Sequence, residues 1–365
     1  MSPEAQARLQ KLASLQPSPN PAFEQALAQE AAARGRRFLN GIKAYRQHPA
    51  RRKIPAAHII WQDGTTKLRD YNPKAPDAPA ILVIPSLINR FDILDLDRDH
   101  SFLRALAEQG FRPFVVDWDE PGESEKNFTL EDYITQRLIP AFEIASEQSG
   151  KAVHILGYCM GGLLALALAA LRPQRTRTLT LMATPWDFHK PDAAISPEFL
   201  ALADELEPSL QANGILSVDI IQSLFSLFQP MQVFTKFVDA AALDPASAEA
   251  RHFVLLEDWL NDGVPLTAPT ARECLRGWYG ENLTARFAWT IGGQIIDPRT
   301  LNIPSYVLAP GKDRIVPPES AMPLAKLIPR ASLHEPMMGH IGLIASRNAP
   351  QQVWAPLFKW LDKHK

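Results

Sequence analysis

The stretch AVHILGYCMGGLLALALAAL, residues 152–171, decides the fold class of this chain. It starts with an apolar run typical of a buried strand, passes through the turn GYCMGG, and continues with good helix formers. The turn places Cys159 between glycines. Glycines are needed there because a strained turn between strand and helix brings neighbouring backbone too close for side chains. The pattern therefore predicts a nucleophilic cysteine on a sharp turn, with the N-terminus of the following helix directed at its thiol.

Similar apolar runs recur before and after this stretch. They are AILVIP (80–85), PFVVDW (113–118), TLTLM (178–182) and SYVLA (305–309), and an edge strand is expected at HIIWQ (58–62). Helix-length segments at residues 103–109, 130–148 and 162–172 separate several of them. Buried parallel strands have such continuous apolar runs because helices cover both faces of their sheet. The sequence predicts an α/β fold with a mostly parallel sheet, in which a G-x-nucleophile-x-G turn is the nucleophile elbow of the α/β-hydrolase fold.

The alternation of strands and helices is interrupted after Met182. We interpret residues 185–294 as an inserted, mainly helical cap on a core formed by residues 61–184 and 295–365. Residues 1–60 are expected to form a helical N-terminal region. The length of 365 residues suits either one large domain with such an insertion or two modest domains.

The composition excludes several classes of protein. With 38 Lys and Arg residues against 40 Asp and Glu residues, the chain has no overall attraction to nucleic acid. Two cysteines cannot form a disulfide framework, so a reducing compartment is expected. The N-terminal residues lack the pattern of a signal peptide, and the longest apolar stretch, residues 163–171, is too short to span a bilayer. These features predict a cytoplasmic protein without a membrane span.

The charge is uneven along the chain. Residues 1–60 contain ten Lys and Arg residues but three Asp and Glu residues, with clusters at residues 34–37 and 51–53. Such a cluster is either a solvated helix face or a patch for an anionic ligand, such as a CoA phosphate, or for an acidic partner subunit.

An elbow of this kind requires an acid after one late strand and a histidine after the next. Asp313 lies in a turn that follows the apolar run at 305–309, and His340 lies later, in a loop with flanking glycines. We predict that Cys159 attacks an acyl carbonyl, with His340 as its general base and Asp313 orienting the imidazole.

Backbone N–H groups are expected to bind the oxyanion that forms during this attack. One belongs to Met160, directly after the nucleophile, and the other to the loop at residues 86–89, where we choose Ile88. The alternatives to the predicted histidine and acid are His334, which lacks a flanking glycine, and Asp297, which precedes the late strand instead of following it.

Other conspicuous residues have simpler interpretations. His154 lies inside a predicted strand and Cys274 inside a helical segment, so both are expected to pack in the interior. The stretch SLFSLFQPMQVFTKF, residues 223–237, indicates either ordinary core packing or an acyl channel. No CxxC, no HExxH and no GxGxxG after a strand is present, so neither a metal site nor a bound cofactor is expected.

These motifs resemble those of the polyhydroxyalkanoate synthase family, in the α/β-hydrolase superfamily. GYCMGG is similar to that family's GxCxGG box, which is narrower than the general elbow. Further similar blocks follow one another in the family's order: GIKAYRQHPARR (41–52), LINRFDILDLDRDHSFLRALAEQGFRPFVVDW (87–118), TPWDFHKPD (184–192), GKDRIVPP (311–318) and GHIGLI (339–344). The resemblance therefore extends from about Gly41 to the C-terminus.

The resemblance implies an acyltransferase that polymerises (R)-3-hydroxyacyl-CoA into a polyester and releases CoA, with the acyl group held on Cys159. Cys159, Asp313 and His340 fall on the family's Cys-Asp-His positions, and CoA is part of the substrate, so no separate cofactor is implied. Asn89 and Arg314 are expected to bind substrate. A homodimer at the surface of polyester granules is also implied. The short length is similar to the class with a small second subunit, whereas GYC is closer to the single-subunit class.

The chain departs from the family pattern at two places. Arg314 stands directly after Asp313, where the family normally has His, and it either pairs with Asp313 or meets a CoA phosphate. The loop before His340 reads MMG, where the family prefers two glycines.

Two other functions therefore remain open. One is a hydrolase with the same triad, acting on a hydroxyacyl thioester or on the polyester, which differs only in admitting water. The other is a catalytically weak, granule-associated subunit that retains the triad by descent. The identity of the product separates the two enzymes, and Cys159→Ala separates both from the third function.

Overall fold

The chain forms two compact units in the computed structural model. The structure describes residues 20–55, 57–190, 204–228 and 231–365. The larger unit contains the described residues of 51–229 and 255–365, and the smaller unit contains those of 1–50 and 230–254.

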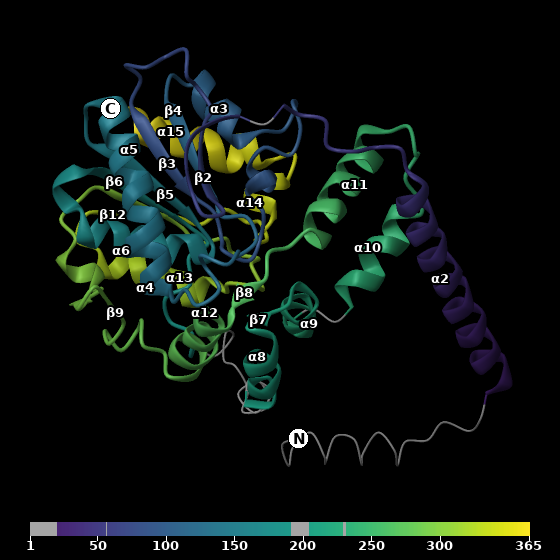
Figure 1. The fold of residues 1–365 in the computed structure, drawn as a ribbon. Coiled ribbons are helices and arrows are strands. Elements are labelled where there is room, and N and C mark those ends of the chain that lie inside the picture. Colours follow the sequence, from purple (N-terminus) through teal and green to yellow (C-terminus); the bar gives the residue numbers. More distant parts are fainter. Residues whose placement is uncertain (1–19, 56, 191–203, 229–230) are drawn as a thin grey trace. The chain divides into compact units, whose positions relative to one another are not determined.

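A sheet of eight strands forms the centre of the larger unit (Figure 1). In spatial order the strands are β1 (His58–Asp63), β2 (Thr66–Asp70), β4 (Arg112–Asp117), β3 (Ala80–Ile84), β5 (Val153–Tyr158), β6 (Thr176–Met182), β11 (Ser305–Leu308) and β12 (Ala331–His334). β2 pairs antiparallel with both β1 and β4, and all the other neighbours are parallel. The predicted α/β fold with a mostly parallel sheet is confirmed, and every predicted apolar run lies in one of these strands.

The strands are apolar throughout because their side chains alternate between two hydrophobic cores, one on each face of the sheet. In β3, Leu82 and Ile84 belong to one core, whereas Ile81 and Val83 belong to the other. The first core is covered by α5 (Ile139–Ser149) and α6 (Met160–Leu171), and the second by α3 (Phe102–Glu108) and α15 (Ala355–Asp362). The expected helices on both faces are therefore present (Figure 1).

Further helical segments connect these layers. They are η1 (Phe91–Leu94), α4 (Leu130–Asp132), the π-helical η2 (Tyr133–Leu138), η3 (Pro173–Arg175), η5 (Pro298–Thr300), α13 (Pro318–Leu327), α14 (Gly342–Ala345) and the π-helical η6 (Pro350–Trp354). α4, η2 and α5 follow one another without a break, which agrees with the single helix predicted at residues 130–148.

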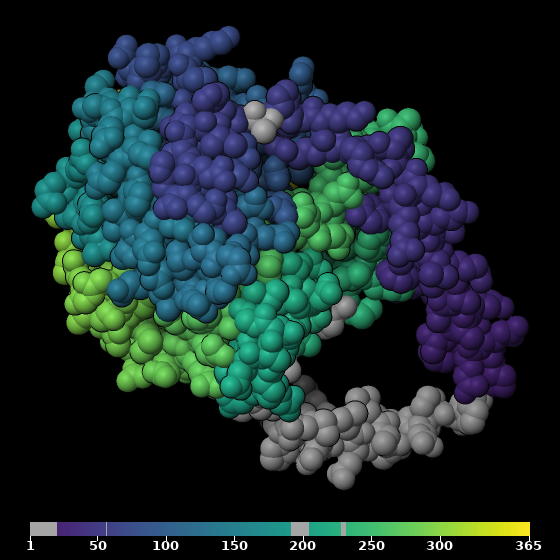
Figure 2. Space-filling view, viewed as in Figure 1, coloured from purple at the N-terminus to yellow at the C-terminus, as the bar shows by residue number. Residues whose placement is uncertain are grey.

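Between β6 and β11 the larger unit contains a further set of short elements. They are α8 (Glu207–Asn213), β7 (Ile215–Leu216), α9 (Val218–Phe228), β8 (Leu266–Thr267), α12 (Ala268–Arg272), the π-helical η4 (Glu273–Gly280), β9 (Thr290–Ile291) and β10 (Gln294–Ile295). Arg272 pairs with Glu207 at 2.8 Å, and the surfaces of α8 and of the segment after α12 are continuous in Figure 2. The hydroxyls of Thr267 and Thr270 donate to the Phe128 carbonyl at 2.6 and 2.8 Å, which ties α12 and the adjoining η4 to the sheet-bearing core.

The smaller unit consists of helices. It contains α2 (Pro21–Gln47), α10 (Gln232–Ala240) and the first half of α11 (Ala248–Asn261). The ring of Phe38 stacks on that of Phe234 with centroids 5.1 Å apart. At Gly41 a Cβ would lie 1.9 Å from the Phe237 carbonyl oxygen, so glycine allows α2 and α10 to touch through their backbones. Arg34, from the basic cluster, is exposed and pairs with Glu30.

The boundaries of the two units do not coincide with the predicted domain boundaries. The units divide the chain after residues 50, 229 and 254, within the segments predicted as the N-terminal region and the cap. The division into core and cap therefore stays a prediction. Among the described residues, no helix combines the length and the apolar character needed to cross a membrane.

Candidate active site

Cys159 forms the sharp turn between β5, which ends at Tyr158, and α6, which begins at Met160. Its backbone has φ 58° and ψ −129°, a conformation that residues with side chains rarely adopt and that costs about 1–3 kcal/mol. The Cys159 N–H donates to the Met182 carbonyl at 2.8 Å, which fixes the turn against the end of β6. The sulfur is thereby held at the N-terminus of α6, where the helix dipole favours negative charge.

The glycines around Cys159 are required by close backbone contacts. A Cβ at Gly161 would lie 2.2 Å from the Ile84 carbonyl oxygen, and one at Gly162 would lie 1.8 Å from Thr184 Oγ1. Because Ile84 ends the neighbouring strand β3, α6 can start this close to the sheet only if its first turn lacks side chains on that face. The GxCxGG pattern is therefore a packing requirement of the turn.

His340 and Asp313 form a buried pair. His340 Nδ1 lies 2.7 Å from Asp313 Oδ2, and the side chains are 8% and 0% exposed. The two residues come together because they follow β12 and β11, which are neighbours in the sheet. The N–H groups of Ile315 and Val316 donate to Asp313 Oδ1 at 2.8 and 2.9 Å, so the carboxylate is held through both oxygens.

Cys159 completes this arrangement, since its sulfur is one of the groups that act on the imidazole of His340. Burial disfavours a charged imidazole, but the charges of Asp313 and Cys159 and the hydrogen bonds to both outweigh it and raise the pKa of His340 to about 10. The ring therefore carries a proton at neutral pH. The structure brings together the three residues predicted as nucleophile, acid and histidine.

Tyr158 is a residue of the site that sequence reasoning missed. Its ring stacks on that of His340 with centroids 5.2 Å apart, and its hydroxyl donates to the His340 carbonyl at 3.1 Å. Burial, with the charges of Cys159 and Asp313, raises the pKa of Tyr158 well above its ordinary value, so it remains a neutral phenol. Tyr158 thus holds the histidine loop in place. Its position directly before the nucleophile is the one signal in the sequence, and that signal says nothing about its contacts.

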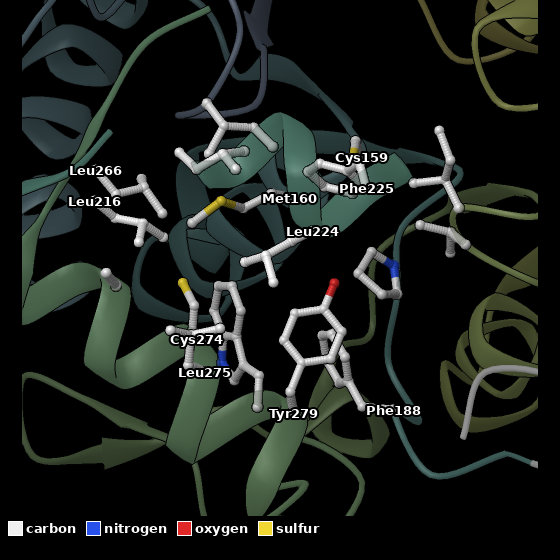
Figure 3. A pocket seen from close by; sticks show the side chains of 17 residues that line it. Cys159, Met160, Phe188, Leu216, Leu224, Phe225, Leu266, Cys274, Leu275 and Tyr279 are labelled. Atoms are coloured by element: carbon white, nitrogen blue, oxygen red, sulfur yellow. The ribbon is translucent and has the colours of Figure 1, made fainter. Parts of the chain in front are cut away.

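A pocket opens at Cys159 (Figure 3). Its empty space is about 750 Å³, a part of which is open solvent, and this lies in the range of ligand pockets. The residues that line it come from the elbow, from loops after β3, β6 and β11, and from the elements between β6 and β11: Ile88, Cys159, Met160, Pro185, Phe188, Leu216, Ile221, Leu224, Phe225, Leu266, Ala271, Cys274, Leu275, Trp278, Tyr279, Ile315 and Val316. Nearly all of these side chains are apolar, so the pocket suits an acyl group.

The residues predicted to bind the oxyanion and the substrate lie in different places. Met160 lines the pocket as the first residue of α6, where backbone N–H groups have no partner within the helix. Ile88 also lines the pocket, with its N–H 3.5 Å from Ser86 Oγ. Asn89 is half-buried and Arg314 is exposed, and neither lines this pocket. The roles of these residues stay predictions.

The rival residues are engaged elsewhere. His334 Nε2 lies 2.8 Å from the Gln352 carbonyl, and Asp297 pairs with Arg299 at 2.7 Å. Neither lines the pocket that contains Cys159. Among the described residues, no three His, Cys, Asp or Glu side chains form a group that could hold a metal ion.

Three further features are interpreted from sequence as packing residues or as an acyl channel. His154 is buried beside Thr178, as expected for a structural histidine, and burial lowers its pKa to about 3. Cys274 is buried as predicted, but it also lines the pocket. The Phe-rich stretch is divided: Leu224 and Phe225 line the pocket, whereas its later residues in α10 pack against α2 in the smaller unit.

A family model described as the alpha/beta hydrolase fold matches residues 79–346. The chain belongs to this family. Two solved structures of similar fold are a monoacylglycerol lipase from Paleococcus ferrophilus (TM-score 0.53, 14% identity, 82% of this chain and 99% of that one) and a thermophilic esterase from Thermogutta terrifontis (0.50, 19%, 86% and 100%). At these identities the likeness shows the fold alone.

This alpha/beta hydrolase also has curated relatives named poly(3-hydroxyalkanoate) polymerase subunit PhaC. The relative from Haloferax mediterranei is 30% identical over 313 residues, which are 83% of this chain and 63% of that one. Relatives from Synechocystis sp. and Allochromatium vinosum are 25% and 26% identical, over 84% and 85% of this chain and 84% and 88% of their own. The resemblance to polyhydroxyalkanoate synthases is confirmed.

Proposed function

We propose that the protein is an acyltransferase that moves (R)-3-hydroxyacyl groups from CoA to Cys159 and then to the hydroxyl end of a growing polyester. The observation that carries the proposal is that Cys159 lines an apolar pocket and interacts with the buried, hydrogen-bonded pair of His340 and Asp313. The names of the relatives support it. A thiol suits this task because thiol–thioester exchange is nearly isoenergetic, so the acyl group stays transferable.

The first half of the reaction loads Cys159. Its sulfur attacks the carbonyl carbon of the acyl-CoA thioester, and the oxyanion forms at the N-terminus of α6, near the Met160 N–H. When the tetrahedral intermediate collapses, the bond from the carbonyl carbon to the CoA sulfur breaks. The protonated His340 gives its proton to the leaving CoA thiolate, which leaves a neutral imidazole and an acylated Cys159.

The second half transfers the acyl group. Neutral His340 takes the proton of the attacking chain-end hydroxyl, whose oxygen bonds to the carbonyl carbon. The bond to the Cys159 sulfur then breaks, and the thiolate and the imidazolium are restored. Asp313 stays ionised and stabilises the imidazolium throughout. The apolar walls of the pocket disfavour water as the competing nucleophile.

The proposal extends to a homodimer that works in the cytoplasm at the surface of polyester granules. The resemblance to the synthase family and the word subunit in the names of the relatives support this. Light scattering on the purified chain of 40.6 kDa should give a mass twice that value. A single-chain mass that increases only when a second, different subunit is added would replace the homodimer with a two-subunit enzyme.

Product analysis with (R)-3-hydroxybutyryl-CoA tests the function. Wild type should release CoA and form chloroform-soluble polymer, Cys159→Ala should do neither, and Cys274→Ala, the matched control, should do both. Release of CoA with free 3-hydroxybutyrate alone would make the protein a thioesterase. Granule binding without turnover by wild type would make it a non-catalytic subunit.

A further inference from the structure

The pocket at Cys159 contains one side-chain oxygen. Of the residues that line it, all of them described, Tyr279 alone has a hydroxyl, and no carboxylate, amide or cationic side chain is present. Figure 3 shows the Tyr279 hydroxyl pointing into the cavity, toward the side on which Cys159 lies. A polar substrate group that enters this pocket therefore meets a single side-chain hydroxyl.

The ring of Tyr279 is held from several sides. It packs edge-on against the ring of Phe188 with centroids 4.8 Å apart, and its backbone carbonyl lies 2.9 Å from His189 Nε2. The helix it belongs to, η4, starts with Glu273, whose carboxylate accepts from the Leu130 N–H of the core at 2.8 Å. Tyr279 is also part of a π-helical segment, an arrangement that recurs at functional sites. The hydroxyl is thus presented from a fixed position.

The Tyr279 hydroxyl keeps its proton at all ordinary pH values. Burial, followed by the charges of Cys159 and Cys274, raises the pKa of Tyr279 far above its usual range. The group is therefore a neutral donor and acceptor of hydrogen bonds, and it does not act as an acid or base.

The proposed substrate carries a hydroxyl two carbons from the carbonyl that Cys159 attacks. Because the carbonyl oxygen is expected at the N–H of Met160, the substrate hydroxyl must lie in the pocket itself. There it loses its bonds to water, and an unpartnered buried hydroxyl opposes binding. We propose that Tyr279 binds the 3-hydroxyl of the substrate and thereby selects hydroxyacyl thioesters over plain acyl thioesters. This inference rests on the proposed acyltransferase function.

Comparing two substrates on two variants tests the role of Tyr279. Single-turnover CoA release is measured with (R)-3-hydroxybutyryl-CoA and with butyryl-CoA, which lacks the hydroxyl. Wild type should prefer the hydroxylated substrate by about 10–100-fold in kcat/KM. Tyr279→Phe should lose about that factor on the hydroxylated substrate and keep its rate on butyryl-CoA.

Tyr133→Phe is the matched control. Tyr133 is also buried in a π-helical segment, and its ring packs against Phe128 with centroids 5.3 Å apart, but it does not line the pocket. This variant should change neither rate. Equal losses on both substrates by Tyr279→Phe would assign the hydroxyl to structure or to the carbonyl, and would overturn the proposal. A wild type that releases CoA equally fast from both substrates would also overturn the proposal, and that comparison needs no variant. Absence of CoA release by wild type from either substrate would instead count against the acyltransferase function.

Discussion

Two cysteines line the same pocket and are built for different chemistry. Cys159 stands on a turn with φ 58°, at the N-terminus of α6, and interacts with His340. Cys274 lies within the π-helical η4, with regular helical neighbours on both sides. Burial, followed by the charge of Glu273, raises the pKa of Cys274 well above its ordinary value. The surroundings of Cys159 thus suit a nucleophile, whereas those of Cys274 keep its thiol protonated.

The difference comes from the backbone and the partners, since the side chains are the same. A thiolate needs positive charge nearby, and Cys159 has both the dipole of α6 and the protonated His340. Cys274 has apolar neighbours and a carboxylate, which both favour its neutral form. Position in a pocket is therefore insufficient to make a cysteine a nucleophile.

The largest expected effect comes from replacing each of the two cysteines with alanine. Cys159→Ala should lower the rate of CoA release by about 10⁴-fold or more, because it removes the atom that forms the acyl bond. Cys274→Ala should change that rate by about threefold or less, because it only enlarges the pocket slightly. Release of CoA from (R)-3-hydroxybutyryl-CoA measures both. Similar losses of the CoA-release rate in the two variants would show that Cys159 and Cys274 do not differ in their contribution to the reaction.

A second test removes the charge that supports the reactive sulfur. Asp313→Asn should lower kcat by about 10²–10⁴-fold, because an amide does not hold the imidazole in the required tautomer or stabilise its proton. Asp297→Asn is the control, since Asp297 pairs with the exposed Arg299 outside the pocket. Steady-state kinetics of both variants should show a change in the first alone. A large loss in the second would return Asp297 to the list of candidate acids.

The elbow and its partners could be predicted from sequence because local rules determine them. Gly161 and Gly162 have no room for a Cβ, so a strand, this glycine pattern and a helix indicate the turn. Asp313 and His340 follow neighbouring parallel strands, whose carboxyl ends meet at one edge of the sheet. Order along the chain was therefore enough to bring the two residues together.

Other features of the fold and the site depend on contacts between distant segments, so no local sequence pattern indicates them. Tyr158 acts through the loop of His340, and Tyr279 reaches the pocket from an element far along the chain. The smaller unit forms because α10 packs on α2, through Gly41 and Phe237, and neither helix indicates its partner. The half-polar strand β2 was not predicted, and β12 was expected only as a strand before His340 without bounds, because each has few apolar residues.

A third test concerns the backbone of the reactive turn. Gly161→Ala should destabilise the protein by about 3 kcal/mol, because the new Cβ meets the Ile84 and Pro85 carbonyl oxygens, which cannot move aside without distorting β3. Gly35→Ala, in α2, has open space around its Cβ and should gain about 0.5–1 kcal/mol from helix propensity. Urea unfolding measures both. An unchanged Gly161→Ala protein would mean that the turn is less tightly packed than its geometry indicates.

The smallest expected effect is on the pH dependence of stability. Of the two cysteines, only Cys159 is expected to influence it. The proton on His340 adds stability that is fully present below about pH 6.5, the ordinary pKa of an unfolded histidine. This contribution falls as the pH rises toward about 10, the pKa of the ring in the folded protein. The difference in unfolding free energy between wild type and His340→Gln should therefore shrink between pH 6.5 and 10. A difference that stays constant over this range would mean that the folded ring is neutral.

The pH dependence of the unfolding free energy should also distinguish the two cysteines. Cys159 is one of the groups whose charge raises the pKa of His340, so in Cys159→Ala the loss of stability should begin at a lower pH. Cys274 does not contribute to that pKa, and Cys274→Ala should follow the wild-type profile. If the profiles of the two variants coincide, the sulfur of Cys159 does not carry negative charge beside the imidazolium. The thiolate would then form only when substrate binds, and the contrast between the two sulfurs would arise during the reaction instead of being present in the resting protein.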